Sequence, residues 1–260
     1  MDFALLGISK LQVFLLVLTR TAGIFTLTPT FGSNHIPPYV RMAMALGLGI
    51  IFLPLVGSGV QLPDDVPNMV FMIAREAMIG LAIGFICMMV FVTIETAGHF
   101  IDAQSGFSFA ASVDPATGNS VSVASKFHNM LAILIFFATN CHHVLLMGLA
   151  ESFRMAPVGQ VDMNPAVANG MVSLFSSLFI VSIRISAPIF AALFLADIAL
   201  AMISRVIPQM NVFVVGLPLK LGLALVGLLI AIPYVSGISH DVLGGVYNHI
   251  TSFMSAAIHP

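Results

Sequence analysis

The feature that most constrains the fold is a series of apolar runs, each about long enough for one helix to cross a bilayer. The runs cover residues 11–27, 40–56, 69–94, 127–150, 171–203 and 212–238. A membrane-spanning helix needs about 20 mostly apolar residues. Only 8% of the 260 residues are charged, whereas ordinary soluble domains carry about 25%, so the chain lacks the side chains to cover a soluble globule. We therefore predict an all-α, multi-helix, membrane-type protein.

Proline, glycine and asparagine separate the runs, and the last two runs are joined by a short break. Pro208, Gln209 and Asn211 predict a tight turn there, which makes residues 171–238 an antiparallel helical hairpin. Residues 171–203 as one straight helix would measure roughly 50 Å, against an apolar membrane core of about 30 Å. Pro188 removes a backbone donor within this run, so we expect a bent helix.

Charged side chains lie inside the apolar runs, where lipid is a poor solvent for them. They are Arg20, Arg75, Glu76, Arg184 and Asp197. Each would cost about 2.5–3.5 kcal/mol or more if it faced lipid at the bilayer centre. Arg75 and Glu76 are adjacent, so on a helix they face different sides and do not pair with each other. We expect the partners of these charges elsewhere in the fold or on another chain, which fits a subunit covered mainly by other subunits.

A small, polar stretch interrupts the apolar pattern between residues 95 and 126. It is rich in glycine, serine and alanine and has too few large side chains for a core of its own, so we interpret it as an insert packed inside something larger. At its start, Glu95, His99 and Asp102 share one face if the preceding helix continues, because they are spaced i, i+4 and i+7. That spacing could ligate a metal or relay protons. A polar stripe that hydrogen-bonds to neighbouring segments is the favoured interpretation.

The sequence lacks the motifs of the common enzyme classes. It has no nucleophile elbow, phosphate-binding glycine loop or zinc-protease helix, so we predict neither an enzyme nor a bound cofactor or metal. The net charge of −2 and the lack of a basic patch argue against nucleic-acid binding. Cys87 and Cys141 lie in apolar runs and are interpreted as buried small hydrophobic residues. Gly80 and Gly84 have the small-xxx-small spacing that lets helices approach closely.

Motifs along nearly the whole chain resemble the FliR family of flagellar biosynthesis proteins and its counterpart in virulence-type type III secretion. The most specific motif is Ser204-Arg205-x-x-Pro208-Gln209-Met210-Asn211-Val212-Phe213. The other motifs are Arg20-Thr-Ala-Gly23 with Pro29, Pro37-Pro38 and Arg41, then Arg75-Glu76 with Ile79-Gly80 and Ile83-Gly84-Phe85, then Glu95-Thr-Ala-Gly98 with Asp102-x-Gln104-x-Gly106-Phe107 and Asp114-Pro115, and finally His142-His143, Ser152-Phe153, Pro157 and Ala187-Pro188. The family often has glycine before the histidine pair, where this chain has Cys141. The motifs look more flagellar than injectisome-like.

The resemblance implies a subunit of an export gate. It implies a FliP-like helical part at residues 1–170 followed by a FliQ-like helical hairpin at residues 171–260, wound with other subunits into a closed helical hetero-oligomeric channel. The implied partners are FliP, FliQ, FlhB, other basal-body and export components, membrane lipid, and unfolded substrates in transit. The implied location is the bacterial inner membrane, crossed several times, within the flagellar basal body. The implied function is the export of unfolded flagellar proteins.

The resemblance and the charge pattern also predict roles for individual residues. The resemblance implies a pore plug in the loop 106–122, with its main residues at Gly106, Phe107, Phe109, Asp114, Pro115, Gly118 and Asn119. Charged residues expected in buried or inter-subunit contacts are Arg20, Arg75, Glu76, Glu95, Asp102, Arg184, Asp197 and Arg205. The hairpin turn is expected at Pro208, Gln209 and Asn211. The alternative function is an ion-coupled secondary transporter, which would also carry charged residues inside the membrane; a membrane enzyme is a third candidate with no supporting motif.

Overall fold

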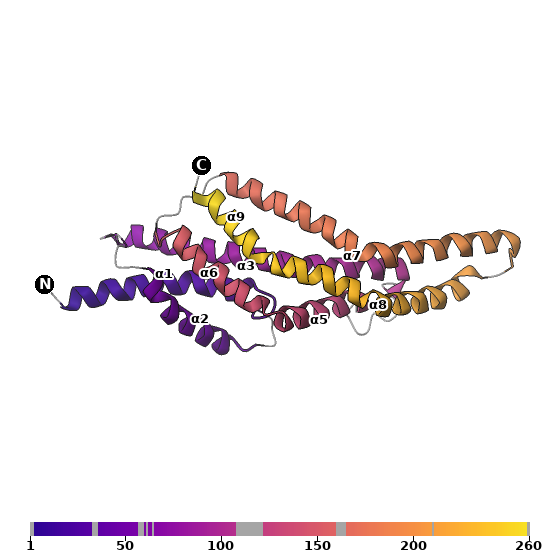
Figure 1. Cartoon of the computed structure of the whole chain (residues 1–260), viewed down its shortest axis with the longest axis horizontal. Coiled ribbons are helices and arrows are strands. Elements are labelled where there is room, and N and C mark those ends of the chain that lie inside the picture. Colours follow the sequence, from indigo (N-terminus) through magenta and orange to yellow (C-terminus); the bar gives the residue numbers. More distant parts are fainter. Residues whose placement is uncertain are drawn as a thin grey trace. The chain divides into compact units, whose positions relative to one another are not determined.

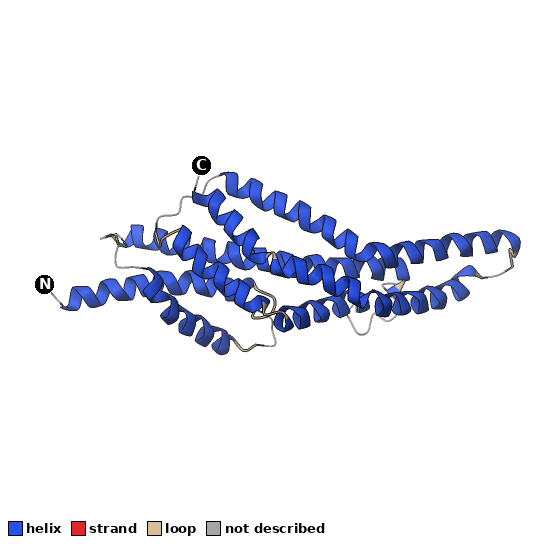
Figure 2. Ribbon diagram, viewed as in Figure 1, coloured by secondary structure: helices blue, strands red, loops and turns tan. Residues whose placement is uncertain are grey.

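The computed structural model describes residues 3–32, 36–56, 60, 62–63, 65–107, 122–159, 165–209 and 211–258. Every regular element in these ranges is a helix (Figure 2), which confirms the all-α prediction. In chain order the helices are α1 (Phe3–Leu27), α2 (Pro38–Phe52), the 3-10 helix η1 (Leu53–Val56), α3 (Val66–Ser105), α5 (Val123–Ala138), α6 (Cys141–Met155), α7 (Pro165–Val206), α8 (Val212–Gly244) and α9 (Val246–Ile258) (Figure 1).

The described helices confirm the predicted membrane-type architecture. Five helical segments are long and apolar enough to cross a membrane, and α5 with α6 makes a sixth candidate that is bent by 71°. α3 has 40 residues and α7 has 42, so each is about 60 Å long, roughly twice the apolar thickness of a bilayer. α7 changes direction near its middle in Figure 1, and Pro188 lies inside this helix.

Residues 127–150 do not form one continuous helix, and that prediction was wrong. α5 ends at Ala138 and α6 begins at Cys141. Asn140, between them, has a φ of 57°, in the left-handed region that most residues avoid and that asparagine tolerates because its short side chain hydrogen-bonds locally. The predicted end of the last helix at residue 238 was also too early, because α8 continues to Gly244 and α9 follows.

The chain forms two compact units, and each is assembled from separated stretches of sequence. The first unit comprises Met1–Val90, Asn140–Phe175 and Gly244–Pro260, and the second comprises Phe91–Thr139 and Ser176–Leu243. α3, α7 and α8 therefore contribute residues to both units. The predicted division at residue 170 separates a FliP-like part from a FliQ-like hairpin by resemblance to those subunits, and it stays a prediction.

In the first unit, α1 and α3 touch backbone to backbone through glycines. A Cβ atom on Gly80 would lie 2.1 Å from the carbonyl oxygen of Arg20, and one on Gly23 would lie 2.7 Å from the carbonyl carbon of Gly80. A Cβ atom on Gly84 would lie 3.1 Å from the carbonyl oxygen of Gly23. The i, i+4 glycine pair therefore lies at a helix contact too close for side chains. In the same unit, α1 packs against α2, and α6 against α9 (Figure 1).

In the second unit, α7 and α8 form a hairpin. The side-chain oxygen of Asn211 accepts hydrogen bonds from the backbone N–H groups of Phe213 at 3.1 Å and Val214 at 3.3 Å. Asparagine is well suited to this role, because its side chain satisfies N–H groups that have no partner in the first turn of a helix. The turn residues thus start α8 as well as reverse the chain.

Candidate functional site

Arg20 of α1 is fully buried in the first unit, although arginine is almost never fully buried unless it is paired. Its Nε donates to Oε2 of Glu76 in α3 at 2.6 Å, and the Glu76 side chain is fully buried too. Its Nη1 donates to the carbonyl oxygens of Ser152 and Ala156, both at 3.0 Å. The guanidinium carbon lies 4.5 Å from the centroid of the Phe153 ring. One side chain therefore joins α1, α3 and the end of α6.

The contacts of Arg20 satisfy the end of α6. The last carbonyl groups of a helix have no partner inside the helix and carry partial negative charge, so a cationic donor suits them. On the other side, Oε1 of Glu76 accepts from the backbone N–H of Gly159 at 2.9 Å, and the φ of +84° at Gly159 favours glycine. The ion pair therefore also fixes the chain just after α6. We call Arg20, Glu76 and these backbone partners the Arg20 hub.

Two of the charges predicted to avoid lipid are therefore partners within one chain. The sequence indicated that Glu76 does not pair with adjacent Arg75, but it could not select Arg20, which lies 56 residues away. Arg75 points elsewhere, with its guanidinium carbon 4.5 Å from the centroid of the Phe71 ring. Such stacking is a favourable cation–π contact.

Asp102, near the end of α3, holds the start of α5 in the second unit. Its Oδ1 accepts from the N–H of Ala124 at 2.9 Å, and its Oδ2 accepts from the N–H of Ser125 at 3.0 Å and from the hydroxyl of Ser122. Asp102 therefore acts, from another helix, as an N-cap side chain for α5. His99, one turn earlier, hydrogen-bonds to the hydroxyls of Ser122 and Ser125, each at 3.2 Å. We call His99, Asp102, Ser122 and Ser125 the Asp102 clasp.

The Asp102 clasp rests on a close contact between α3 and α5. A Cβ atom on Gly98 would lie 2.3 Å from the Cα of Ser125, so only glycine fits there. Glu95, the third member of the predicted polar face, is half-buried. Across the residues that the structure describes, no three His, Cys, Asp or Glu side chains gather closely enough to hold a metal ion. Hydrogen bonding to a neighbouring segment, the favoured interpretation, describes what His99 and Asp102 do.

Asp197 of α7 forms a further polar cluster in the second unit. Its Oδ1 lies 2.9 Å from Nζ of Lys220 in α8, and its Oδ2 accepts from Nε2 of Gln104 in α3 at 2.8 Å. The side chain of Asp197 is 40% exposed and that of Lys220 is 19% exposed. The sequence analysis included Asp197 among the charges that need a partner, but it did not include Lys220. Lys220 could have been recognised as a lone charge inside the apolar run 212–238.

The remaining predicted residues are exposed, half-buried or outside the described residues. Exposed positions are Arg184, Arg205, Pro208, Gln209 and Asn211. Gly106 follows α3 with a φ of +89°, and Phe107 is half-buried. The plug residues outside the described part of the chain are Phe109, Asp114, Pro115, Gly118 and Asn119.

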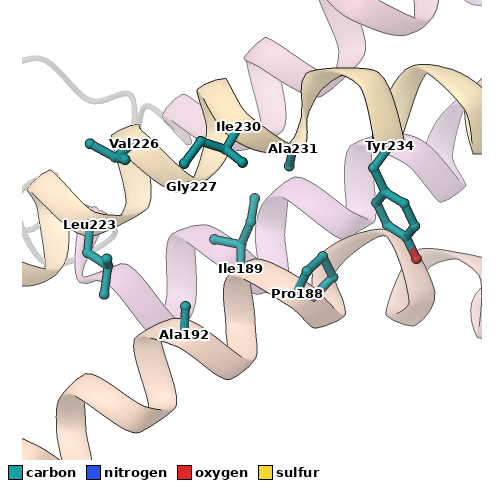
Figure 3. Close-up of a pocket in the computed structure, with 9 residues that line it drawn as sticks. All are labelled: Pro188, Ile189, Ala192, Leu223, Val226, Gly227, Ile230, Ala231 and Tyr234. Atoms are coloured by element: carbon teal, nitrogen blue, oxygen red, sulfur yellow. The ribbon is translucent and has the colours of Figure 1, made fainter.

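A pocket of about 550 Å³ opens between α7 and α8 in the second unit. Ile189 of α7 points toward α8, and Leu223 of α8 points toward α7 (Figure 3). At one end the hydroxyl of Tyr234 donates to the carbonyl oxygen of Arg184 at 3.2 Å. The rest of the lining is apolar, so this pocket is a place for hydrocarbon groups.

Comparison with known proteins identifies the family. The sequence model of the bacterial export proteins, family 1, matches residues 11–245. The flagellar biosynthetic protein FliR of Bacillus subtilis is 34% identical over 238 residues, covering 90% of this chain and 92% of the relative. FliR of Escherichia coli is 25% identical, covering 95% of both chains, and the Yop proteins translocation protein T of Yersinia pestis is 29% identical, covering 88% of both chains. These matches confirm the predicted resemblance, and the chain belongs to family 1 of the bacterial export proteins.

Proposed function

We propose that the chain is a subunit of a type III protein export apparatus and helps to form the channel for unfolded flagellar proteins. The observation that carries the proposal is the match along nearly the whole chain to relatives named for flagellar biosynthesis and for Yop translocation. The proposed location is the bacterial inner membrane, in the flagellar basal body. The proposed role is structural, with no cofactor and no nucleic acid.

The exposed apolar surface of the candidate spans supports assembly with other chains. Only 17% of an 18-residue apolar window of Pro38–Val56 is buried within the chain, and the same share of such a window of Val212–Ala257. Contiguous apolar surface of this extent is typical of faces that contact protein or lipid. The proposed protein partners are FliP, FliQ and FlhB, with residues 1–170 as the FliP-like part and residues 171–260 as the FliQ-like hairpin.

The loop 106–122 is proposed to plug the channel until a substrate displaces it, with the energy for export supplied by other components. The two described ends of this stretch support the proposal. Gly106 has the φ of +89° that lets the chain leave the axis of α3. Ser122 is held by the Asp102 clasp. A segment anchored at both ends suits a plug that stays with its channel.

Deleting residues 108–121 tests the plug, because this deletion keeps Gly106, Phe107 and the whole Asp102 clasp. The assay is leak of a small fluorescent dye from liposomes that contain the complex purified through a tag on this chain. We expect the deletion to increase the leak, and a control deletion of residues 160–163 to leave it unchanged. If the complex keeps all its subunits and the leak is unchanged, the proposal that the loop plugs the channel is contradicted. The proposed role in export would not be affected by that result.

The polar cluster of Asp197, Lys220 and Gln104 favours one other candidate, an ion-coupled secondary transporter. Ionisable residues inside candidate membrane spans are typical of ion pathways. Purification through a tag on this chain separates the two functions. Co-elution with other export components supports the export gate, whereas recovery as a stable monomer or homodimer, together with ion uptake that Asp197→Asn abolishes, supports the transporter.

A further inference from the structure

A second pocket, in the first unit, combines a cationic side chain with an apolar interior. The pocket measures about 240 Å³ and lies between α1 and α2. Leu18, Ala22 and Phe25 of α1 and Ala45 of α2 provide apolar lining, and Arg41 of α2 provides the charge. Neither the Arg20 hub nor the proposed channel accounts for a cation at this place.

The two ends of the pocket differ in chemistry because α1 and α2 run antiparallel. Gly49 of α2 lies against Leu18 of α1, whereas the pocket brings Arg41 near Thr26, at the end of α1. From Thr26 back to Leu18 is about 12 Å along a helix. The polar groups therefore gather where α1 ends and α2 begins, and the pocket becomes apolar toward the middle of both helices.

The polar end lies at a boundary of the candidate membrane spans. α1 ends at Leu27 and the α2 span begins at Pro38, so Arg41 is about 5 Å inside the span. Nε and Nη2 of Arg41 donate to the carbonyl oxygen of Ile36 at 3.2 and 3.0 Å, which holds the guanidinium at the start of the helix. Tyr39, 69% exposed, is at the same end, and tyrosine is enriched where membrane meets water.

We propose that this pocket binds an anionic phospholipid, with the headgroup phosphate at Arg41 and part of an acyl chain between α1 and α2. The guanidinium is complementary in charge to a phosphate. The N-terminus of α2 carries the positive end of the helix dipole. It lies at the same end of the pocket as Arg41 and adds to the positive charge there. The apolar lining is complementary to a hydrocarbon chain, and basic pockets between transmembrane helices are known sites for anionic headgroups. This site is independent of the proposed function in export.

The test measures lipid retention by native mass spectrometry on the full chain, purified in dodecyl maltoside with whatever subunits co-elute. The probes are dioleoyl phosphatidylglycerol, which is anionic, and dioleoyl phosphatidylcholine, which has no net charge. We expect Arg41→Gln to weaken phosphatidylglycerol binding about fivefold, the factor expected for one basic residue near a membrane surface. Arg41→Lys should retain the preference for phosphatidylglycerol.

A second variant, Ala22→Leu, tests the apolar part of the pocket and keeps the test decisive if Arg41→Gln does not fold. The larger side chain fills the pocket and should reduce retention of both lipids. Arg154→Gln, which removes an exposed cation of α6, is the matched control and should change neither.

Three results would overturn the proposal. In the first, Arg41→Gln keeps the preference for phosphatidylglycerol, or Ala22→Leu leaves lipid retention unchanged. In the second, excess inorganic phosphate displaces phosphatidylglycerol, which would mark a site for a free anion. In the third, Arg41→Gln loses a co-eluting protein while its lipid count stays the same, which would mark a protein interface.

Discussion

Removing both partners of the Arg20 hub should destabilise the chain less than the sum of the losses from removing each partner alone. Glu76→Leu leaves the guanidinium of Arg20 without its carboxylate, and Arg20→Met leaves the carboxylate of Glu76 without its cation. Both side chains are fully buried, and breaking a buried pair on one side costs about 3–5 kcal/mol because the remaining charge has no water around it.

The structure ranks the two single variants. In Glu76→Leu, Arg20 keeps its hydrogen bonds to the carbonyl oxygens of Ser152 and Ala156, so the loss should lie near 3 kcal/mol. In Arg20→Met, the carbonyl oxygen of Ala156 loses the guanidinium donor, whereas that of Ser152 still accepts from the backbone N–H of Ala156. A buried polar group that loses its partner costs about 1–3 kcal/mol. We therefore expect a loss near 5 kcal/mol or more.

The double variant Arg20→Met with Glu76→Leu removes both charges. It should lose about 2–3 kcal/mol less than the sum of the single losses, since contacting residues couple by up to about 3 kcal/mol. The assay is the free energy of unfolding of the purified chain in dodecyl maltoside titrated with sodium dodecyl sulfate and followed by circular dichroism. The control is Arg154→Gln, which breaks an exposed i, i+3 pair with Glu151 and should change stability by less than about 0.5 kcal/mol.

Two results would refute this reasoning. The first is a pair of single variants within about 1 kcal/mol of the unmodified chain, which would mean that water reaches the pair. The second is a double variant whose loss equals the sum of the single losses, which would mean that Arg20 and Glu76 do not stabilise each other.

Three further predictions use the same unfolding assay unless stated otherwise. Gly80→Ala should cost about 2–3 kcal/mol because its Cβ would strike backbone, whereas Gly47→Ala, which meets nothing within 4 Å, should stabilise by about 0.5–1 kcal/mol. Asp102→Ala should cost about 1–2 kcal/mol and speed hydrogen exchange in the first turn of α5, measured by mass spectrometry. Lys220→Met should cost only about 1 kcal/mol, because its partner Asp197 is 40% exposed.

Each of these predictions has a distinct contrary outcome. Equal stability of the Gly80→Ala and Gly47→Ala variants would show that α1 and α3 can move apart freely. Unchanged exchange at the start of α5 would mean that Asp102 is not its cap. A loss from Lys220→Met as large as that from Glu76→Leu would place the Asp197 cluster out of reach of solvent.

Most helices could be predicted from sequence because apolar length is a local property. The break between α5 and α6 is the main exception. The break depends on one residue, Asn140, which has a left-handed backbone conformation. A single asparagine inside an otherwise apolar run is only weak evidence for a helix end. α9 was missed because its sequence is less uniformly apolar than that of the spans and follows directly after α8.

The sequence identified charges that lipid could not accommodate, but it could not identify their partners. Burial cost is a property of each side chain alone, and it marked Arg20 and Glu76, which are fully buried in the structure. The pairing of these two depends on how α1 packs on α3, which rests on the glycine contact at Gly80. The role of Asp102 was likewise hidden, because it caps a helix that begins beyond the intervening loop.

The Arg20 hub also has a consequence for how the chain is made. Arg20 leaves the ribosome 56 residues before Glu76, a delay of about 3–11 seconds at ordinary rates of synthesis. The carbonyl groups of Ser152 and Ala156 arrive later still, 132 and 136 residues after Arg20. During this interval α1 is a nascent hydrophobic helix that carries an uncompensated cation. We therefore expect α1 to stay near the lipid headgroups at first and to reach its final depth in the membrane only when α3, which carries Glu76, has been inserted.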